Sequence, residues 1–172
     1  MANIGFISLG CAKNQVDCER MMYRIQEAGH TVCAGIEGCD VVIINTCGFI
    51  DSAKSEAIDY ILMTAQLKEQ GSVGKILVTG CLSQRYQQMI MEELPEVDGV
   101  LGTGSYADVV EAVDRLLADE TIDERMLEIL SGKQDEFDSF ADESMVGDLQ
   151  IQVEENSAWI KKLVAEEQKR TL

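Results

Sequence analysis

The chain has 172 residues, enough for one sizeable domain and a further segment, and its 14 basic and 31 acidic residues give a net charge of −17 at pH 7. Negative charge of this size argues against a phosphate-binding surface, so we expect no direct binding to nucleic acid. No apolar run approaches the roughly 20 residues that cross a bilayer, and the N-terminus lacks the features of a signal peptide. We therefore expect a cytoplasmic protein without membrane contact.

Apolar runs alternate with helical stripes over the first 118 residues. The strands are expected at residues 3–10, 30–33, 41–44, 75–79 and 97–101. The run Val41–Ile44 has no polar alternation, which is typical of a strand buried on both faces. Helices are expected between and after the strands, from about Gln15 with Asn14 as N-cap, from Asp51 or Ser52, from Ser83, and from Ser105.

This alternation predicts an α/β fold of the flavodoxin or Rossmann type, an open and mostly parallel five-stranded sheet with helices on both faces. The link between the second and third strands is too short for a crossover between parallel neighbours. Either the second strand lies at an edge of the sheet, or a short helix is hidden in the link. An order of 2-1-3-4-5 would make strands one, three and four adjacent.

Three of the six cysteines stand where these strands give way to helices. Cys11, Cys47 and Cys81 each follow a predicted strand and each has a glycine neighbour. The carboxyl ends of adjacent parallel strands share one edge, so the three thiols are expected to meet there. The partial positive charge of a helix N-terminus lowers the pKa of a thiol and favours the thiolate that binds metals.

The pattern of thiols leaves two interpretations open. In a reducing compartment cysteines serve metal binding or catalysis more often than disulfides, and thiolates suit an iron–sulfur cluster or zinc. Structural zinc takes four ligands, and Cys39 lies at the opposite end of its strand. A cluster held by three cysteines leaves one iron open to an added ligand. The alternative is that these three cysteines are ordinary small residues at turns. Cys18 is expected to be a small buried residue of a helix and not a ligand.

A nucleotide or flavin site of the flavodoxin type is a further alternative. Residues 102–107 (GTGSYA) fit the pattern G-x-G-x-x-A after a strand and before a helix. They follow the last strand, however, and no further βαβ unit supplies an acid for the ribose, so a turn with a helix cap is the simpler interpretation. We recognise no set of catalytic residues, and His30 is assigned no role.

Residues 119–172 are predicted to form an acidic, partly disordered tail after a domain of residues 1–118. From residue 118 on, the chain has fifteen acidic and six basic residues and no cysteine. Residues 132–147 are predicted to be a mobile linker. A terminal amphipathic helix carries Trp159, Ile160, Leu163 and Val164 on one side. This helix packs on its own domain or docks a partner, so a non-catalytic interaction protein is another hypothesis.

Four motifs, in order, resemble the N-terminal domain of the radical-SAM methylthiotransferases. They are residues 8–17 (SLGCAKNQVD), 45–54 (NTCGFIDSAK), 78–86 (VTGCLSQRY) and 94–98 (LPEVD). The first two are closest to the branch that methylthiolates an aspartate of a small-subunit ribosomal protein, and a tRNA methylthiotransferase domain is the alternative. The resemblance implies a transferase whose auxiliary 4Fe–4S cluster is ligated by Cys11, Cys47 and Cys81, with an open iron that carries the sulfur or methylsulfide.

The chain departs from this family in one respect that concerns its chemistry. The family continues into a barrel whose C-x-x-x-C-x-x-C triad binds a second cluster and S-adenosylmethionine, and no cysteine follows Cys81 here. We therefore expect no S-adenosylmethionine binding by this chain, and expect it to bind a cluster without completing the reaction alone. A radical-SAM partner or further domains would supply the radical chemistry.

Overall fold

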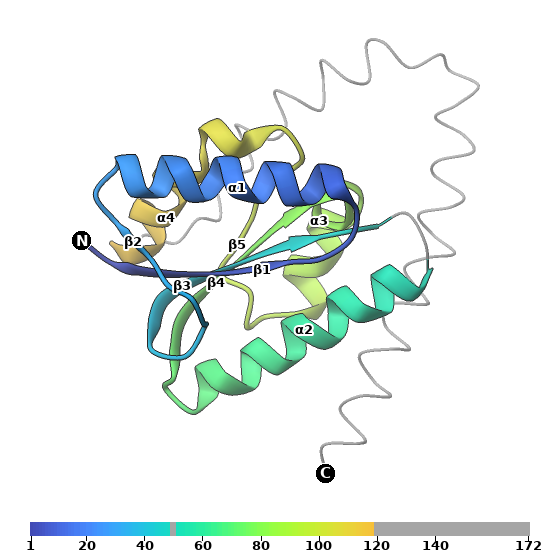
Figure 1. The fold of residues 1–172 in the computed structure, drawn as a ribbon. Helices are drawn as coiled ribbons and strands as arrows, with labels where there is room; N and C mark the ends of the chain where they lie inside the picture. The colour runs from blue at the N-terminus through green and yellow to red at the C-terminus, as the bar shows by residue number, and fades with distance from the viewer. Residues whose placement is uncertain (49–50, 119–172) are drawn as a thin grey trace. The chain divides into compact units, whose positions relative to one another are not determined.

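The computed structural model describes residues 1–48 and 51–118. Within these residues the chain forms a single sheet covered by helices (Figure 1). The expected linker and amphipathic helix of the tail lie outside the described residues, and the division at residue 118 therefore stays a prediction.

The sheet has five parallel strands, which confirms the expected fold class, and their order, β2-β1-β3-β4-β5, is the one under which the first, third and fourth strands are adjacent. The strands are β1 (Asn3–Ser8), β2 (Thr31–Val32), β3 (Cys39–Thr46), β4 (Val73–Gly80) and β5 (Gly99–Val100). Because β2 lies at the edge beyond β1, the short link to β3 joins strands that are not neighbours. The register pairs Ile7 with Ile44 and Ile44 with Val78, so β1, β3 and β4 end side by side.

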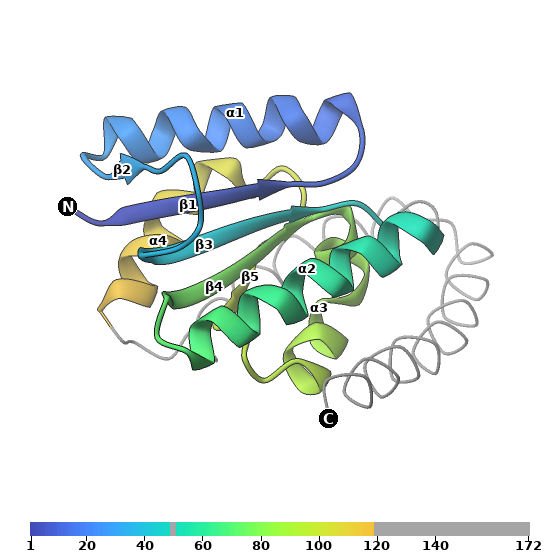
Figure 2. The same ribbon diagram turned by 60° about the horizontal axis from the view of Figure 1, so that its bottom comes forward.

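Helices cover both faces of the sheet (Figures 1 and 2). They are α1 (Ala12–Glu27), α2 (Asp51–Glu69), α3 (Cys81–Glu93) and α4 (Val109–Leu117), with a 3-10 turn, η1 (Ser105–Ala107), before the last. One face carries α1 and α4, which contact each other, and the other carries α2 and α3. No helix of the described ranges has the length and apolar character needed to cross a membrane.

The central strands form the core. All four residues of Val41–Ile44 are fully buried, and Ile76, Leu77 and Val78 of β4 are buried equally. Each fully buried aliphatic side chain of this size contributes roughly 1.5–3 kcal/mol to folding. Cys18 of α1 is 1% exposed, which confirms that it is a core residue, and it shares the buried face of the helix with Met21 and Ile25.

Three predicted helix starts were wrong, two of them for a shared reason. The N-cap of α1 is Cys11 and not Asn14, and the N-cap of α3 is Gly80 and not Ser83. Both polar side chains lie inside the first turn and bind the ends of neighbouring elements; the hydroxyl of Ser83 donates to the carbonyl oxygens of Gly80 and Leu101. Ser105 begins the 3-10 turn, and α4 starts only after Asp108. Tertiary hydrogen bonds therefore decided the roles of Asn14 and Ser83.

Candidate functional site

The carboxyl ends of β1, β3 and β4 carry the three cysteines singled out by the sequence. Cys11 is the N-cap of α1, Cys47 follows the last residue of β3, and Cys81 is the first residue of α3. All three are free thiols: Cys11 is exposed, Cys47 is buried, and Cys81 is half-buried. The adjacency of the three strands brings these turns to one edge of the sheet, which we call the thiol edge. Cys18, Cys33 and Cys39 lie elsewhere.

Glycines allow these turns to approach one another closely. Gly10 has φ +99°, and a Cβ added to it would overlap the Cβ of Cys47 and lie 3.1 Å from its Sγ. Gly80 has φ +103°, and its Cβ would collide with the backbone of Thr46. A side chain at Gly48 would meet the backbone nitrogen of Leu82 at 3.0 Å. Every turn of the thiol edge is therefore packed against a neighbouring turn, and a Cβ would separate them.

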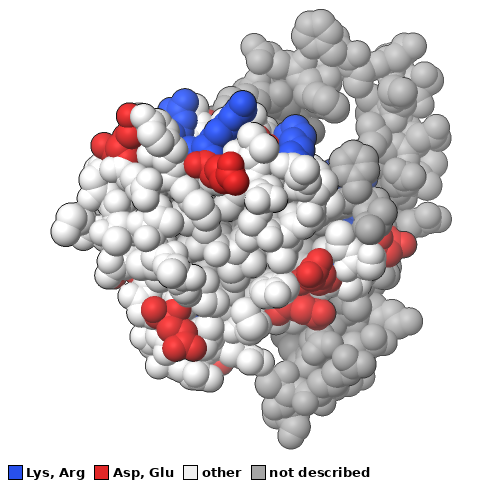
Figure 3. All heavy atoms as spheres, viewed as in Figure 1, with Lys and Arg blue, Asp and Glu red and all other residues white. Residues whose placement is uncertain are grey.

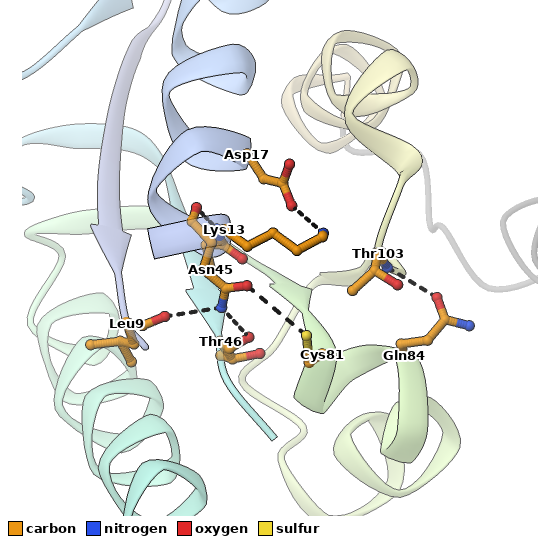
Figure 4. Close-up of polar contacts among 9 residues, drawn as sticks. Leu9, Lys13, Asp17, Asn45, Thr46, Cys81, Gln84 and Thr103 are labelled. Atoms are coloured by element: carbon orange, nitrogen blue, oxygen red, sulfur yellow. Dashed lines mark hydrogen bonds and ion pairs between the residues drawn. The ribbon is translucent and has the colours of Figure 1, made fainter. Parts of the chain in front are cut away.

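Asn14 is a functional candidate that the sequence reasoning missed. Its side-chain nitrogen donates to the carbonyl oxygens of Leu9 at 3.0 Å and Thr46 at 2.9 Å, and its side-chain oxygen lies 4.0 Å from the Sγ of Cys81 (Figure 4). The side-chain nitrogen of Asn45 donates to the backbone oxygen of Asn14 at 2.7 Å. The available signal was position: Asn14 precedes Cys18 by four residues on the buried face of α1, where a polar residue needs partners.

The electrostatics of the thiol edge differ from one cysteine to the next. Backbone N–H groups of Asn14 and then Lys13 lower the pKa of Cys11, because they stabilise its thiolate. Burial raises the pKa of Cys81, and the nearby thiols of Cys47 and Cys11 raise it further. The ammonium of Lys13, which is paired with Asp17 at 2.8 Å, acts in the opposite direction. The thiols are thus close enough to influence one another's charge.

A single metal ion does not fit the side chains as they stand. Among residues 1–48 and 51–118, no group of three or more histidine, cysteine, aspartate or glutamate side chains is arranged to hold one ion. Cys39, already a poor fourth ligand by sequence, opens β3 at the opposite edge of the sheet. Within the described residues the three thiols therefore share one edge without forming the ligand set of a single ion.

The glycine turn after β5 is occupied by a side chain. The backbone nitrogen of Thr103 donates to the side-chain oxygen of Gln84 at 3.0 Å (Figure 4), and a Cβ on Gly102 would overlap that same oxygen. The turn leads into the three-residue η1 and not directly into an α-helix, so it presents no helix N-terminus to a phosphate. These contacts favour the interpretation of residues 102–107 as a structural turn.

The fold and the thiol edge together define a parallel α/β domain with cysteines at three adjacent strand ends. The sequence model of Uncharacterized protein family UPF0004 matches residues 3–102, and the chain belongs to this family.

Curated relatives carry the name "Ribosomal protein uS12 methylthiotransferase RimO". The one from Syntrophomonas wolfei subsp. wolfei is 48% identical over 120 residues, which cover 70% of this chain and 27% of that protein. Those from Natranaerobius thermophilus and Clostridioides difficile are 46% and 48% identical, over 66% and 63% of this chain and 26% and 24% of theirs. The chain thus spans about a quarter of the length of these relatives.

Proposed function

We propose that this domain binds one 4Fe–4S cluster through Cys11, Cys47 and Cys81 and serves as the sulfur-donor half of a methylthiotransferase. The observation that carries the proposal is that β1, β3 and β4 are adjacent. The free thiols that follow these three strands therefore lie along one edge of the sheet. The relatives named uS12 methylthiotransferase support the ribosomal-protein branch over the tRNA branch. In those relatives the name belongs to a much longer chain, so substrate and activity are proposed for the protein to which this domain contributes.

Three cysteine thiolates are the kind of ligand that holds iron–sulfur clusters in proteins. A cluster of four irons places each cysteine on a different iron, so its thiolates stand farther apart than the ligands of a single metal. The lowered pKa of Cys11 favours a thiolate at the exposed side of the edge. When bound, the cluster would supply one iron without a cysteine ligand, at which an added sulfur species could be held.

The chain's own residues would orient the three ligands. Asn14 ties the start of α1 to the ends of β1 and β3, which fixes the backbone that carries Cys11 and Cys47. Gly10 and Gly80 permit the turns to close without a Cβ between them. Lys13, the cation beside Cys81, would partly offset the negative charge of three thiolates.

Anaerobic reconstitution of the full chain with iron and sulfide tests this proposal. We expect about four irons and about four sulfides per chain, as a 4Fe–4S cluster requires. The variant Cys47→Ser should retain little iron, whereas Cys18→Ser, which changes a buried cysteine away from the edge, should load as the parent chain does. Equal iron content in the parent chain and in a variant lacking all three edge cysteines would contradict the proposal.

A further inference from the structure

A second pair of cysteines lies at the opposite edge of the sheet. Cys33 follows β2 and Cys39 opens β3, with five residues between them. The backbone nitrogen of Cys33 donates to the carbonyl oxygen of Ile4 at 2.9 Å. The Sγ of Cys39 lies 3.1 Å from the point where a Cβ of Gly5 would stand. Both cysteines are therefore held beside consecutive residues of β1.

The connecting loop folds back on itself over β1. A Cβ on Gly5 would also meet the backbone of Gly35 and Ile36 at 3.2 Å, so the loop rests directly on a strand residue without a side chain. The thiol of Cys39 donates to the carbonyl oxygen of Gly35 at 3.4 Å. Its backbone nitrogen donates to the carbonyl oxygen of Ile36 at 3.4 Å. These contacts hold Cys39 against residues 35 and 36, which follow Cys33 by two and three positions.

The two thiols differ in their exposure to solvent, and the pKa of Cys39 is raised. Cys33 is partly exposed, whereas Cys39 is buried. Burial, the hydrogen bond and charge of the Cys33 thiol, and the charge of Asp40 raise the pKa of Cys39 to about 11. Cys39 is therefore a protonated thiol next to Cys33 at neutral pH. An oxidant from solvent would reach Cys33 first, and Cys39 lies close enough to Cys33 to be influenced by its thiol.

We propose that Cys33 and Cys39 form a redox-active dithiol that closes to a reversible intramolecular disulfide with a low-molecular-weight disulfide as oxidant. The thiolate of Cys33 attacks one sulfur of the oxidant and releases one small thiol. Cys39 then loses its proton, and its thiolate attacks the sulfur of Cys33 and releases the second small thiol. The two protons of the protein thiols end on the two released thiols, the protein is oxidised by two electrons, and the oxidant is reduced by two.

This site is separate from the thiol edge. Cys39 and Cys47 stand at opposite ends of β3, and eight residues of extended chain span roughly 26 Å. Oxidation of the Cys33–Cys39 pair therefore consumes none of the proposed cluster ligands. The inference goes beyond the proposed function, and the pair would close whether or not a cluster binds.

The test treats the reduced full chain with oxidised glutathione, blocks remaining thiols, and digests it with a protease that cuts after glutamate and aspartate. Glu27, Glu37, Asp40 and Asp51 then define three peptides, 28–37, 38–40 and 41–51, which separate Cys33, Cys39 and Cys47. We expect peptides 28–37 and 38–40 to be joined, and to separate after treatment with reduced glutathione in excess. The joined pair should have the summed mass of the two peptides less two hydrogen atoms.

Single substitutions show which cysteines form the disulfide and which of them reacts first with glutathione. Cys39→Ser should keep glutathione on Cys33 as a stable mixed disulfide, whereas Cys18→Ser should form the link as the parent chain does. The proposal is overturned if peptides 28–37 and 38–40 are never joined, whichever other cysteines have reacted. It is also overturned if the parent chain keeps glutathione on Cys33 to the same extent as the Cys39→Ser variant.

Discussion

The side-chain nitrogen of Asn14 lies 2.9 Å from the carbonyl oxygen of Thr46, the residue directly before Cys47. The same nitrogen binds the carbonyl oxygen of Leu9 at 3.0 Å, and Asn45 returns a hydrogen bond of 2.7 Å to the backbone oxygen of Asn14. One buried amide therefore joins the start of α1 to the ends of two strands. The positions of Cys11 and Cys47 relative to each other depend on this residue.

Replacing Asn14 by alanine should destabilise the fold by about 2–4 kcal/mol, because two buried carbonyl oxygens lose their donor. Urea unfolding followed by circular dichroism measures the change. Gln15→Ala is the matched control, since Gln15 is exposed on the same turn of α1, and it should change the free energy of unfolding by less than about 0.5 kcal/mol. Equal effects of the two substitutions would mean that Asn14 does not fasten the edge.

Replacing Gly10 by alanine should cost about 2–5 kcal/mol, because a positive φ and an overlap with Cys47 act together. Gly29→Ala isolates the first contribution: Gly29 has φ +89° but nothing within 4 Å of its Cβ. That control should lower the free energy of unfolding by only about 1–2 kcal/mol, because backbone strain acts there alone. Thermal or urea unfolding compares the two variants, and similar losses would show that Gly10 and Cys47 are not in contact.

Alkylation of the reduced, cluster-free chain should modify Cys11 at lower pH than Cys81. The thiolate is the reactive form, and it is present above the pKa of each group. Backbone N–H groups lower the pKa of Cys11, whereas burial raises that of Cys81, so the rate at Cys11 rises first as the pH increases from about 6 to about 9. Quenched time courses with mass spectrometry give both rates. Faster modification of Cys81 near neutral pH would contradict this order.

On the face of the molecule seen in Figure 3, the basic side chains of the described residues are grouped in one region. In the view of Figure 3, lysine and arginine side chains gather along the upper edge, over the position of α1 in Figure 1, with acidic side chains beside them. The guanidinium carbon of Arg20 in this helix lies over the ring of Tyr106, 5.9 Å from the ring centroid. The view shows mixed charges over α1 and not a continuous basic surface of the kind that follows a phosphate backbone.

The sequence predicted the layers because the central strands carry an unambiguous pattern, whereas the strand order was only one arrangement consistent with it. Val41–Ile44 and the apolar residues of β4 can be buried only inside a sheet that is covered on both faces. The edge strands were harder to delimit: β5 was expected over residues 97–101 and spans Gly99–Val100, since it has a neighbour only in β4. Strand length at an edge depends on pairing, which local sequence does not contain.

The placement of the three cysteines on one edge of the sheet was predictable from the sequence. The contacts that support them were not. The spacing of Cys11, Cys47 and Cys81 after three strands follows from the chain itself, and the strand order puts them on one edge. Asn14 looked like a helix cap because its partners, Leu9 and Thr46, come together only in the folded sheet. The Cys33–Cys39 pair likewise depends on a loop closing over Gly5, a contact between distant segments.

Whether the three edge thiols share one cluster can be tested by comparing cysteine reactivity before and after anaerobic cluster loading. Mass spectrometry would follow alkylation of Cys11, Cys81 and the partly exposed Cys33 in the full chain. We expect loading to abolish reactivity at Cys11 and Cys81 and to leave Cys33 unchanged, and we expect Cys47→Ser to prevent this protection. Protection of Cys33, or undiminished reactivity of Cys11 or Cys81 in the loaded protein, would contradict a shared cluster.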